Sequence, residues 1–164
     1  TFRKDELEKM NFKFDIDQFL ERLDEKYVLL IRLHPSVKDV THIKRHPRVL
    51  VVNDYPHVNE LMIASDILVT DYSSIPFEFS LLRKKMIFFT YDLASYDKEQ
   101  GLWDETSLSF PGPIVKTTSE VIDHILDPTI DFHKIDSFKN HWNTFSTGHA
   151  TKTLISMIYD DNDL

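Results

Sequence analysis

Two short apolar runs on either side of a helical segment constrain the fold of this chain more than any other feature. The first run covers residues 67–69 and stops at the polar turn 71–74 (Asp-Tyr-Ser-Ser), and the second covers residues 86–89. Between them, residues 75–82 carry apolar side chains at helical spacing. Continuous apolar strands around a helix are typical of a parallel sheet that is covered on both faces. Residues 64–91 therefore predict a strand–helix–strand unit.

The rest of the chain repeats this alternation. Further strands are predicted at residues 27–31, 49–52 and 114–115, and helices at residues 15–26, 59–65, 119–126, 136–142 and 150–159. In the last helix Leu154, Ile155 and Ile158 are expected to face inward. The 164 residues suffice for one domain with a full core. The pattern predicts a single α/β domain over residues 1–164, a doubly wound parallel sheet of about five or six strands with an acidic tail at residues 160–164.

The charge of the chain limits the ligands to be considered. The net charge of −8 argues against general nucleic-acid binding. The charge is uneven, however, because residues 27–53 contain one acid, Asp39, and several basic side chains, namely Arg32, Lys38, Lys44, Arg45 and Arg48. A solvated basic face is the default interpretation, and a local field that attracts an anionic ligand is the alternative. No apolar run approaches the roughly 20 residues of a membrane helix.

Polar side chains follow the predicted strands, where ligands of parallel sheets bind. They are Arg32 and His34, Asn53 and Asp54, Asp71 with Ser73 and Ser74, and Tyr91 with Asp92. Arg32 suits phosphate because a guanidinium donates two parallel hydrogen bonds, and His34 donates a hydrogen bond or transfers a proton near neutral pH. The turn 71–74 opens a helix whose unpaired N–H groups favour phosphate, although the same residues are ordinary caps. Glu78 either accepts hydrogen bonds from a ribose or is plain helix surface.

Several catalytic arrangements are excluded by the residues themselves. The chain has three glycines and neither the Rossmann nor the P-loop fingerprint, and no Gly-x-Ser-x-Gly elbow occurs. His42 and His46 lie four residues apart without a third metal ligand at a suitable spacing. The residues therefore favour a phosphate group that is held without a metal by Arg32, His34 and the helix start.

Taken together, these motifs resemble the CDP-glycerol glycerophosphotransferase family, the teichoic acid primases and polymerases of Gram-positive bacteria. The resemblance rests on residues 65–96 (SDILVTDYSSIPFEFSLLRKKMIFFTYDLASY), preceded by IRLHP and followed by PGPIV, and it covers residues 1–150. It implies a GT-B glycosyltransferase-type fold of two Rossmann-like domains, of which this chain is the carboxyl-terminal, donor-binding half. It also implies transfer of glycerol phosphate or ribitol phosphate from CDP-glycerol or CDP-ribitol to a lipid-linked acceptor at the cytoplasmic face of the membrane, without a metal or other cofactor.

The resemblance also assigns roles to individual residues. Arg32 and His34 match the family's Arg-x-His-Pro motif and would bind the donor pyrophosphate, with His34 as the catalytic candidate through phosphate stabilisation. Further substrate-binding candidates are Asp71, Ser73 and Ser74 in the Asp-Tyr-Ser-Ser turn, Glu78 for the ribose, Arg3, and Gly112 in the turn at residues 111–113.

Two stretches depart from the family pattern. Residues 147–153 lack the acid and the arginine of Asp-Gly-Lys-Ala-Ser-x-Arg, and residues 100–103 replace Arg-Gly-Phe-Tyr with Gln-Gly-Leu-Trp. Either change would fit a different alditol or acceptor. The catalytic base and any membrane-surface association are expected in an amino-terminal half outside this chain, so we expect the fragment to bind donor without turnover. A nucleotide-sugar transferase or epimerase half and a non-catalytic α/β scaffold domain stay open as alternatives.

Overall fold

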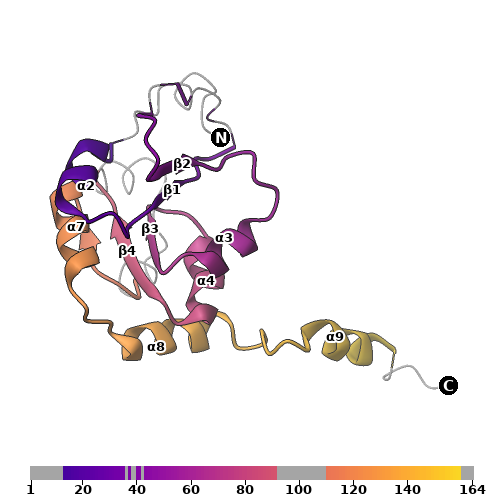
Figure 1. Cartoon of the computed structure of the whole chain (residues 1–164). Coiled ribbons are helices and arrows are strands. Elements are labelled where there is room, and N and C mark those ends of the chain that lie inside the picture. Colours follow the sequence, from indigo (N-terminus) through magenta and orange to yellow (C-terminus); the bar gives the residue numbers. More distant parts are fainter. Residues whose placement is uncertain (1–12, 36, 38–39, 42, 92–109, 160–164) are drawn as a thin grey trace. The chain divides into compact units, whose positions relative to one another are not determined.

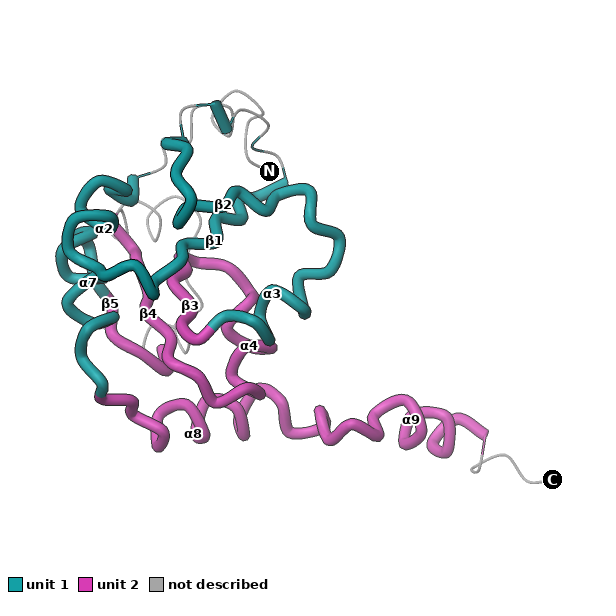
Figure 2. The backbone as a smooth tube through the Cα atoms, viewed as in Figure 1, with its two compact units in different colours: residues 1–65, 115–128 teal, residues 66–114, 129–164 magenta. Residues whose placement is uncertain are grey.

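The computed structural model describes residues 13–35, 37, 40–41, 43–91 and 110–159 (Figure 1). Helices and parallel strands follow one another along the chain, as the sequence predicts. The chain divides into two compact units, which Figure 2 shows in different colours. Unit 1 contains Thr1–Ser65 and Val115–Pro128, and unit 2 contains Asp66–Ile114 and Thr129–Leu164.

Among the described residues, unit 1 has a sheet of two parallel strands. β1 (Leu29–Ile31) pairs with β2 (Val49–Val51), and the register sets Leu29 opposite Val49 and Ile31 opposite Val51. One further ladder bond follows, in which the Val52 N–H donates to the Ile31 carbonyl over 2.8 Å. Both predicted strands are confirmed, and both are followed directly by the polar segments that the sequence singles out.

The described part of unit 1 has three helices: α2 (Ile16–Arg22), α3 (Val58–Ala64) and α7 (Thr118–Leu126). The side chains of Phe19, Leu23 and Ile122 are buried together between α2 and α7. Polar contacts reinforce this packing, because the Asp15 N–H donates to Thr118 Oγ1 over 2.9 Å. The apolar side chains Phe19 and Leu23 thus pack on α7, whereas Ile16 packs with Ile31 and Val49. Asp15 is the N-cap of α2.

Two residues of the basic stretch serve the local structure of unit 1. The Arg48 guanidinium donates to the carbonyls at the end of α2, those of Leu20, Leu23 and Asp24, over 2.7, 2.8 and 2.9 Å. Such carbonyls have no partner within their own helix, so Arg48 satisfies them. Lys44 forms an ion pair with Asp17. Both charges therefore have local partners, so the basic stretch is not simply a group of free charges that would attract an anionic ligand.

In unit 2, β3 (Ile67–Thr70) and β4 (Lys85–Phe89) form a parallel pair whose register runs from Ile67 opposite Lys85 to Thr70 opposite Phe88. The sheet order is β3-β4-β5, with β5 at Ile114–Val115. Met86, Ile87 and Phe88 are fully buried, which accounts for the continuous apolar run in the sequence. The strand–helix–strand unit predicted for residues 64–91 is confirmed.

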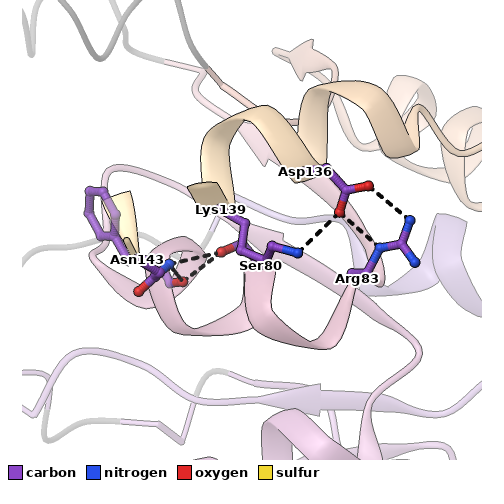
Figure 3. A network of polar contacts seen from close by, with 6 residues as sticks. Ser80, Arg83, Asp136, Lys139 and Asn143 are labelled. Carbon is purple, nitrogen blue, oxygen red and sulfur yellow. Dashed lines mark hydrogen bonds and ion pairs between the residues drawn. The ribbon is translucent and has the colours of Figure 1, made fainter. Parts of the chain in front are cut away.

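Unit 2 connects β3 to β4 through α4 (Ile75–Phe79) and a 3₁₀ turn, η1 (Ser80–Leu82), on which α8 (Phe132–Trp142) packs. Figure 3 shows the polar contacts between them. We call the residues that make these contacts the helix clamp: Phe77, Ser80, Arg83, Asp136, Lys139 and Asn143. Asn143 Nδ2 donates to the Phe77 carbonyl over 2.7 Å and to Ser80 Oγ over 3.2 Å. Arg83 donates to both carboxylate oxygens of Asp136 over 2.9 Å each.

The helix clamp also changes the titration of Asp136. The hydrogen bond from Arg83 is the main reason that the pKa of the Asp136 carboxyl lies below its ordinary value, and a weaker contact with Lys139 acts in the same direction. Beneath these charges, the Phe77 and Phe138 rings stack with their centroids 5.4 Å apart. The clamp thus fixes the carboxyl end of α4 and η1 with both apolar and polar contacts.

The helix α9 (Ala150–Tyr159) extends away from α8 (Figure 1). The prediction that its apolar residues face inward is wrong: Leu154, Ile155 and Ile158 are 57%, 52% and 50% exposed, and α9 has no buried residue. An amphipathic pattern predicts where a helix forms, but it does not specify what covers the apolar face.

Other differences concern pairing and helix starts. The described strands form two sheets, whereas the sequence predicts one sheet of five or six strands, because apolar runs identify strands without identifying their partners. α8 begins at Phe132 instead of 136, with Asp131 as its N-cap, and α3 begins at Val58 instead of 59. The predicted acidic tail at 160–164 lies outside the described residues.

Candidate functional site

The segment that follows β1 carries two of the predicted site residues, Arg32 and His34, both of which are exposed. Arg32 Nη1 donates to the backbone carbonyls of Tyr55, over 2.6 Å, and of Val52, over 3.3 Å. All of its described hydrogen bonds use Nη1, so the donors on Nε and Nη2 stay available. The His34 carbonyl accepts the Val37 N–H over 2.8 Å, which turns the chain after the motif.

A second contact runs between the same two segments in the opposite direction. The backbone N–H of Leu33 donates to the side-chain oxygen Oδ1 of Asn53 over 2.9 Å. We call these residues the strand-end brace: Arg32, Leu33, Val52, Asn53 and Tyr55. The brace joins the segment after β1 to the segment after β2 within unit 1, so the Arg-x-His motif is held before any ligand arrives.

The loop after β2 is itself fixed to α3. The Tyr55 N–H donates to the Val52 carbonyl over 3.2 Å, and the Tyr55 hydroxyl donates to the Glu60 carboxylate. This hydrogen bond raises the pKa of the Tyr55 hydroxyl above its ordinary value, because it stabilises the protonated phenol beside an anion. The carbonyls that receive Arg32 therefore belong to an ordered loop.

The turn 71–74 in unit 2 exposes the side chains of Asp71, Ser73 and Ser74. Ser74 occupies the N-cap position of α4 but makes no side-chain cap bond, and the Ile75 N–H reaches Ser73 Oγ over a long 3.3 Å. The capping role that the sequence offers for these hydroxyls is thus only weakly realised. Because α4 has five residues, the donors of the turn itself, and not a long helix dipole, are what this segment offers an anion.

The other predicted site residues fall in three different settings. Glu78 is exposed on α4. Gly112 packs against β4, where an added Cβ would lie 2.0 Å from the Met86 carbonyl oxygen. Close packing therefore explains why glycine occupies this position, and the sequence does not reveal that reason. Arg3 lies outside the described residues. Arg32 and His34 belong to unit 1, and the other described candidates belong to unit 2.

Sequence reasoning placed Asn53 at a strand end but missed its contact with the backbone of Leu33. A polar residue after a strand carries no sequence signal for a side-chain bond to another strand's extension. Within the described ranges, no three His, Cys, Asp or Glu side chains are grouped as metal ligands. Among the same residues, no helix has the length and apolarity needed to cross a membrane.

The fold and these segments define an α/β protein with parallel strands and exposed cationic and hydroxyl side chains after the strands. Comparison with known sequences gives its family. The signature of CDP-Glycerol:Poly(glycerophosphate) glycerophosphotransferase matches residues 1–160. The chain belongs to this CDP-glycerol glycerophosphotransferase family.

Individual relatives support the same assignment. The chain is 36% identical over 159 residues to the teichoic acid glycerol-phosphate primase of Bacillus subtilis (strain 168), covering 96% of this chain and 41% of the primase. It is 31% identical over 163 residues to the teichoic acid poly(ribitol-phosphate) polymerase of Bacillus spizizenii, covering 96% of this chain and 26% of the polymerase. The chain thus spans less than half the length of either relative.

A solved structure shares the fold. The wall teichoic acid polymerase TagF matches with a TM-score of 0.75 and 28% identity, over 98% of this chain and 41% of that one. A variant of TagF soaked with CDPG for 15 minutes matches with a TM-score of 0.74 and 29% identity, over 98% of this chain and 42% of that one. The parallel α/β architecture of this chain is therefore that of one part of TagF.

Proposed function

We propose that this chain binds the CDP-alditol donor of a teichoic acid glycerophosphotransferase, as the Rossmann-like carboxyl-terminal half of a GT-B-type fold. Family membership and the similarity to TagF support the proposal. Because the chain spans 41% of the Bacillus subtilis primase, the transfer reaction itself is proposed for a longer protein at the cytoplasmic face of the membrane, where the acceptor is lipid-linked.

The observation that carries the proposal is the pattern of hydrogen bonds that the Arg32 guanidinium makes. Its Nη1 is engaged by the carbonyls of Val52 and Tyr55, which fixes the guanidinium after β1. The Nε and Nη2 donors face no described partner, and a planar pair of donors matches two oxygens of a phosphate. A guanidinium that is anchored on one side binds a diphosphate with little loss of side-chain entropy.

The proposed reaction is an in-line attack by an acceptor hydroxyl on the β-phosphorus of the donor, which breaks the bond to the leaving phosphate and releases CMP. Arg32 and His34 stabilise the negative charge that develops on the phosphates. Asp71, Ser73 and Ser74 bind the donor through their turn, Glu78 binds the ribose, and Arg3 and Gly112 are weaker candidates. The base that takes the acceptor proton lies in another part of the longer protein, and no metal takes part.

A calorimetric titration of the chain with CDP-glycerol tests this proposal. Arg32→Ala is expected to weaken binding about 10- to 100-fold, as for the loss of a charge-assisted hydrogen bond of roughly 1.5–3 kcal/mol. Lys44→Ala is the matched control, because it removes a cation of the same basic stretch that is paired with Asp17. Equal binding by wild type and Arg32→Ala would remove Arg32 from the site.

The same titration separates the alternatives. Tighter binding of CDP-ribitol than of CDP-glycerol would identify ribitol as the alditol of the donor and would leave the proposed site unchanged. Preference for a UDP-sugar would favour a nucleotide-sugar transferase or epimerase, and binding of none of these nucleotides would favour a scaffold domain.

A further inference from the structure

The parallel ladder between β1 and β2 changes its pattern at the point where the Arg-x-His motif begins. Along the ladder, the Leu29 N–H donates to the Arg48 carbonyl over 2.8 Å, one residue before its register partner Val49. By the same offset, the Leu33 N–H would donate to the Val52 carbonyl. It donates instead to Oδ1 of the Asn53 side chain over 2.9 Å.

The Val52 carbonyl is occupied by two other donors. It accepts the Tyr55 N–H over 3.2 Å and Arg32 Nη1 over 3.3 Å. The Asn53 side chain therefore substitutes for a main-chain acceptor, which releases Val52 to form the turn and to receive the guanidinium. Without this substitution, either the Leu33 N–H loses its acceptor or Val52 must return to the ladder and release Arg32.

The Leu33 N–H belongs to the peptide that links Arg32 to Leu33. A hydrogen bond to this group fixes the orientation of the peptide plane, and with it the directions in which the side chains on either side leave the backbone. The acceptor is an oxygen on the γ-carbon of Asn53, a feature that Asp shares. Asn has the further property of adding no negative charge beside a segment that would receive an anion.

We propose that Asn53 is a positioning residue, which orients Arg32 toward the donor through the peptide that links Arg32 to Leu33. This inference rests on the proposed donor-binding function, since it assigns to Asn53 the geometry of the same site. Asn53 itself is not expected to contact the donor.

Hydrogen exchange of the Leu33 amide measures the contact directly. In the 164-residue chain without ligand, Asn53→Ala is expected to accelerate exchange at Leu33 at least tenfold, while Asn53→Asp, which keeps the acceptor oxygen, restores slow exchange. Tyr55→Phe is the matched control, because it removes the hydroxyl contact to Glu60 in the same loop and leaves the Tyr55 carbonyl that receives Arg32. Unchanged exchange at Leu33 in Asn53→Ala would overturn the inference.

Affinity for CDP-glycerol distinguishes positioning from plain structural support. Asn53→Ala is expected to weaken binding about fivefold in the wild-type background and by less than twofold in the Arg32→Ala background, because its effect passes through Arg32. Faster exchange at Leu33 with unchanged affinity would show a structural contact only and would overturn the positioning role. Absence of CDP-glycerol binding by the wild type would refute the proposed function and therefore the positioning role, while the exchange measurement would still report the contact.

Discussion

The strand-end brace in unit 1 and the helix clamp in unit 2 use polar contacts in different ways. In the brace, Arg32 both holds the loop after β2 and carries the donors proposed for the diphosphate. In the clamp, the contacts of Arg83 and Asn143 fix the carboxyl end of α4 and η1, whereas the proposed ligand groups of Ser73 and Ser74 precede the amino end of α4. Under the proposed function, stability and binding are thus carried by the same residue in unit 1 and by separate residues in unit 2.

This difference has a practical consequence for mutagenesis. A substitution at Arg32 removes its contacts with Val52 and Tyr55 together with the proposed ligand contacts, so a loss of affinity alone does not separate the two effects. In unit 2 the effects are expected to separate, with clamp substitutions lowering stability and turn substitutions lowering affinity. Four substitutions in unit 2 test this separation, taken here in order of decreasing expected effect.

Gly112→Ala is expected to have the largest effect on stability. The new Cβ would lie 2.0 Å from the Met86 carbonyl oxygen, so the segment that pairs with β4 must shift. We expect a loss of about 3 kcal/mol in the free energy of unfolding, measured by urea denaturation. A neutral substitution would contradict the packing role, and a stable variant with lost CDP-glycerol affinity would return Gly112 to the donor site.

Asn143→Ala removes the contacts of the helix clamp to the Phe77 carbonyl and to Ser80. The Ser80 hydroxyl still donates to the Phe77 carbonyl in the variant. We therefore expect a moderate loss of about 1–2 kcal/mol in the free energy of unfolding. The affinity of the folded protein for CDP-glycerol is expected to stay unchanged. A drop in affinity at temperatures where the variant is fully folded would show that clamp and turn are not separate.

Ser73→Ala is expected to give the reverse result. The Ser73 hydroxyl makes one long contact, with the Ile75 N–H, so its removal should change the melting temperature very little. If the hydroxyl donates to a donor phosphate, the affinity for CDP-glycerol falls about three- to tenfold, as for one hydrogen bond of roughly 1 kcal/mol. Equal affinity in wild type and variant would remove Ser73 from the proposed site.

Asp136→Asn tests the charged part of the helix clamp through pH. Since Arg83 lowers the folded-state pKa of Asp136, its carboxylate stabilises the fold above about pH 4 and loses this effect as the pH falls through the lowered pKa. Between about pH 5 and pH 2, the range in which carboxylates titrate, the free energy of unfolding is therefore expected to fall less in the variant than in the wild type.

The acid dependence of Asp136→Asn is not expected to vanish. The pKa of the Asp15 carboxyl is lowered by the hydrogen bonds that it accepts from Gln18. The pKa of Glu120 is lowered by hydrogen bonds from the backbone of Lys116 and from Thr117, and both carboxyls lie at helix starts of unit 1. An unfolding transition whose pH dependence is identical in wild type and variant would contradict the role of the Arg83–Asp136 pair.

The sequence predicted the elements of this fold better than their contacts. Apolar runs located β1 to β5 within about two residues, and in β4 the run corresponds to a strand that is buried along nearly its whole length. In β2 the run does not correspond to full burial, because Leu50 and Val51 are exposed. The same record does not identify pairing partners, so the division into two sheets was missed. It also did not show that the apolar face of α9 stays exposed, since amphipathicity is a property of one helix and burial is a property of two surfaces.

The candidate site shows the same limit. Arg32 and His34 could be singled out because their residue types suit phosphate and because they follow a strand. The contacts of Arg32 with Val52 and Tyr55, and that of Asn53 with Leu33, depend on which strand lies beside β1, and no local pattern contains this information. Gly112 was selected through family resemblance, whereas the structure gives it a packing reason that only the proximity of Met86 reveals.

The account rests above all on the proposed binding of the CDP-alditol donor by Arg32, in the segment after β1. A nuclear magnetic resonance titration of the ¹⁵N-labelled chain with CDP-glycerol follows this binding at the backbone amides of residues 32–34. We expect these resonances to shift and to saturate with the dissociation constant that calorimetry gives. Resonances of residues 32–34 that stay unshifted while other amides of the chain respond would refute a donor site at Arg32.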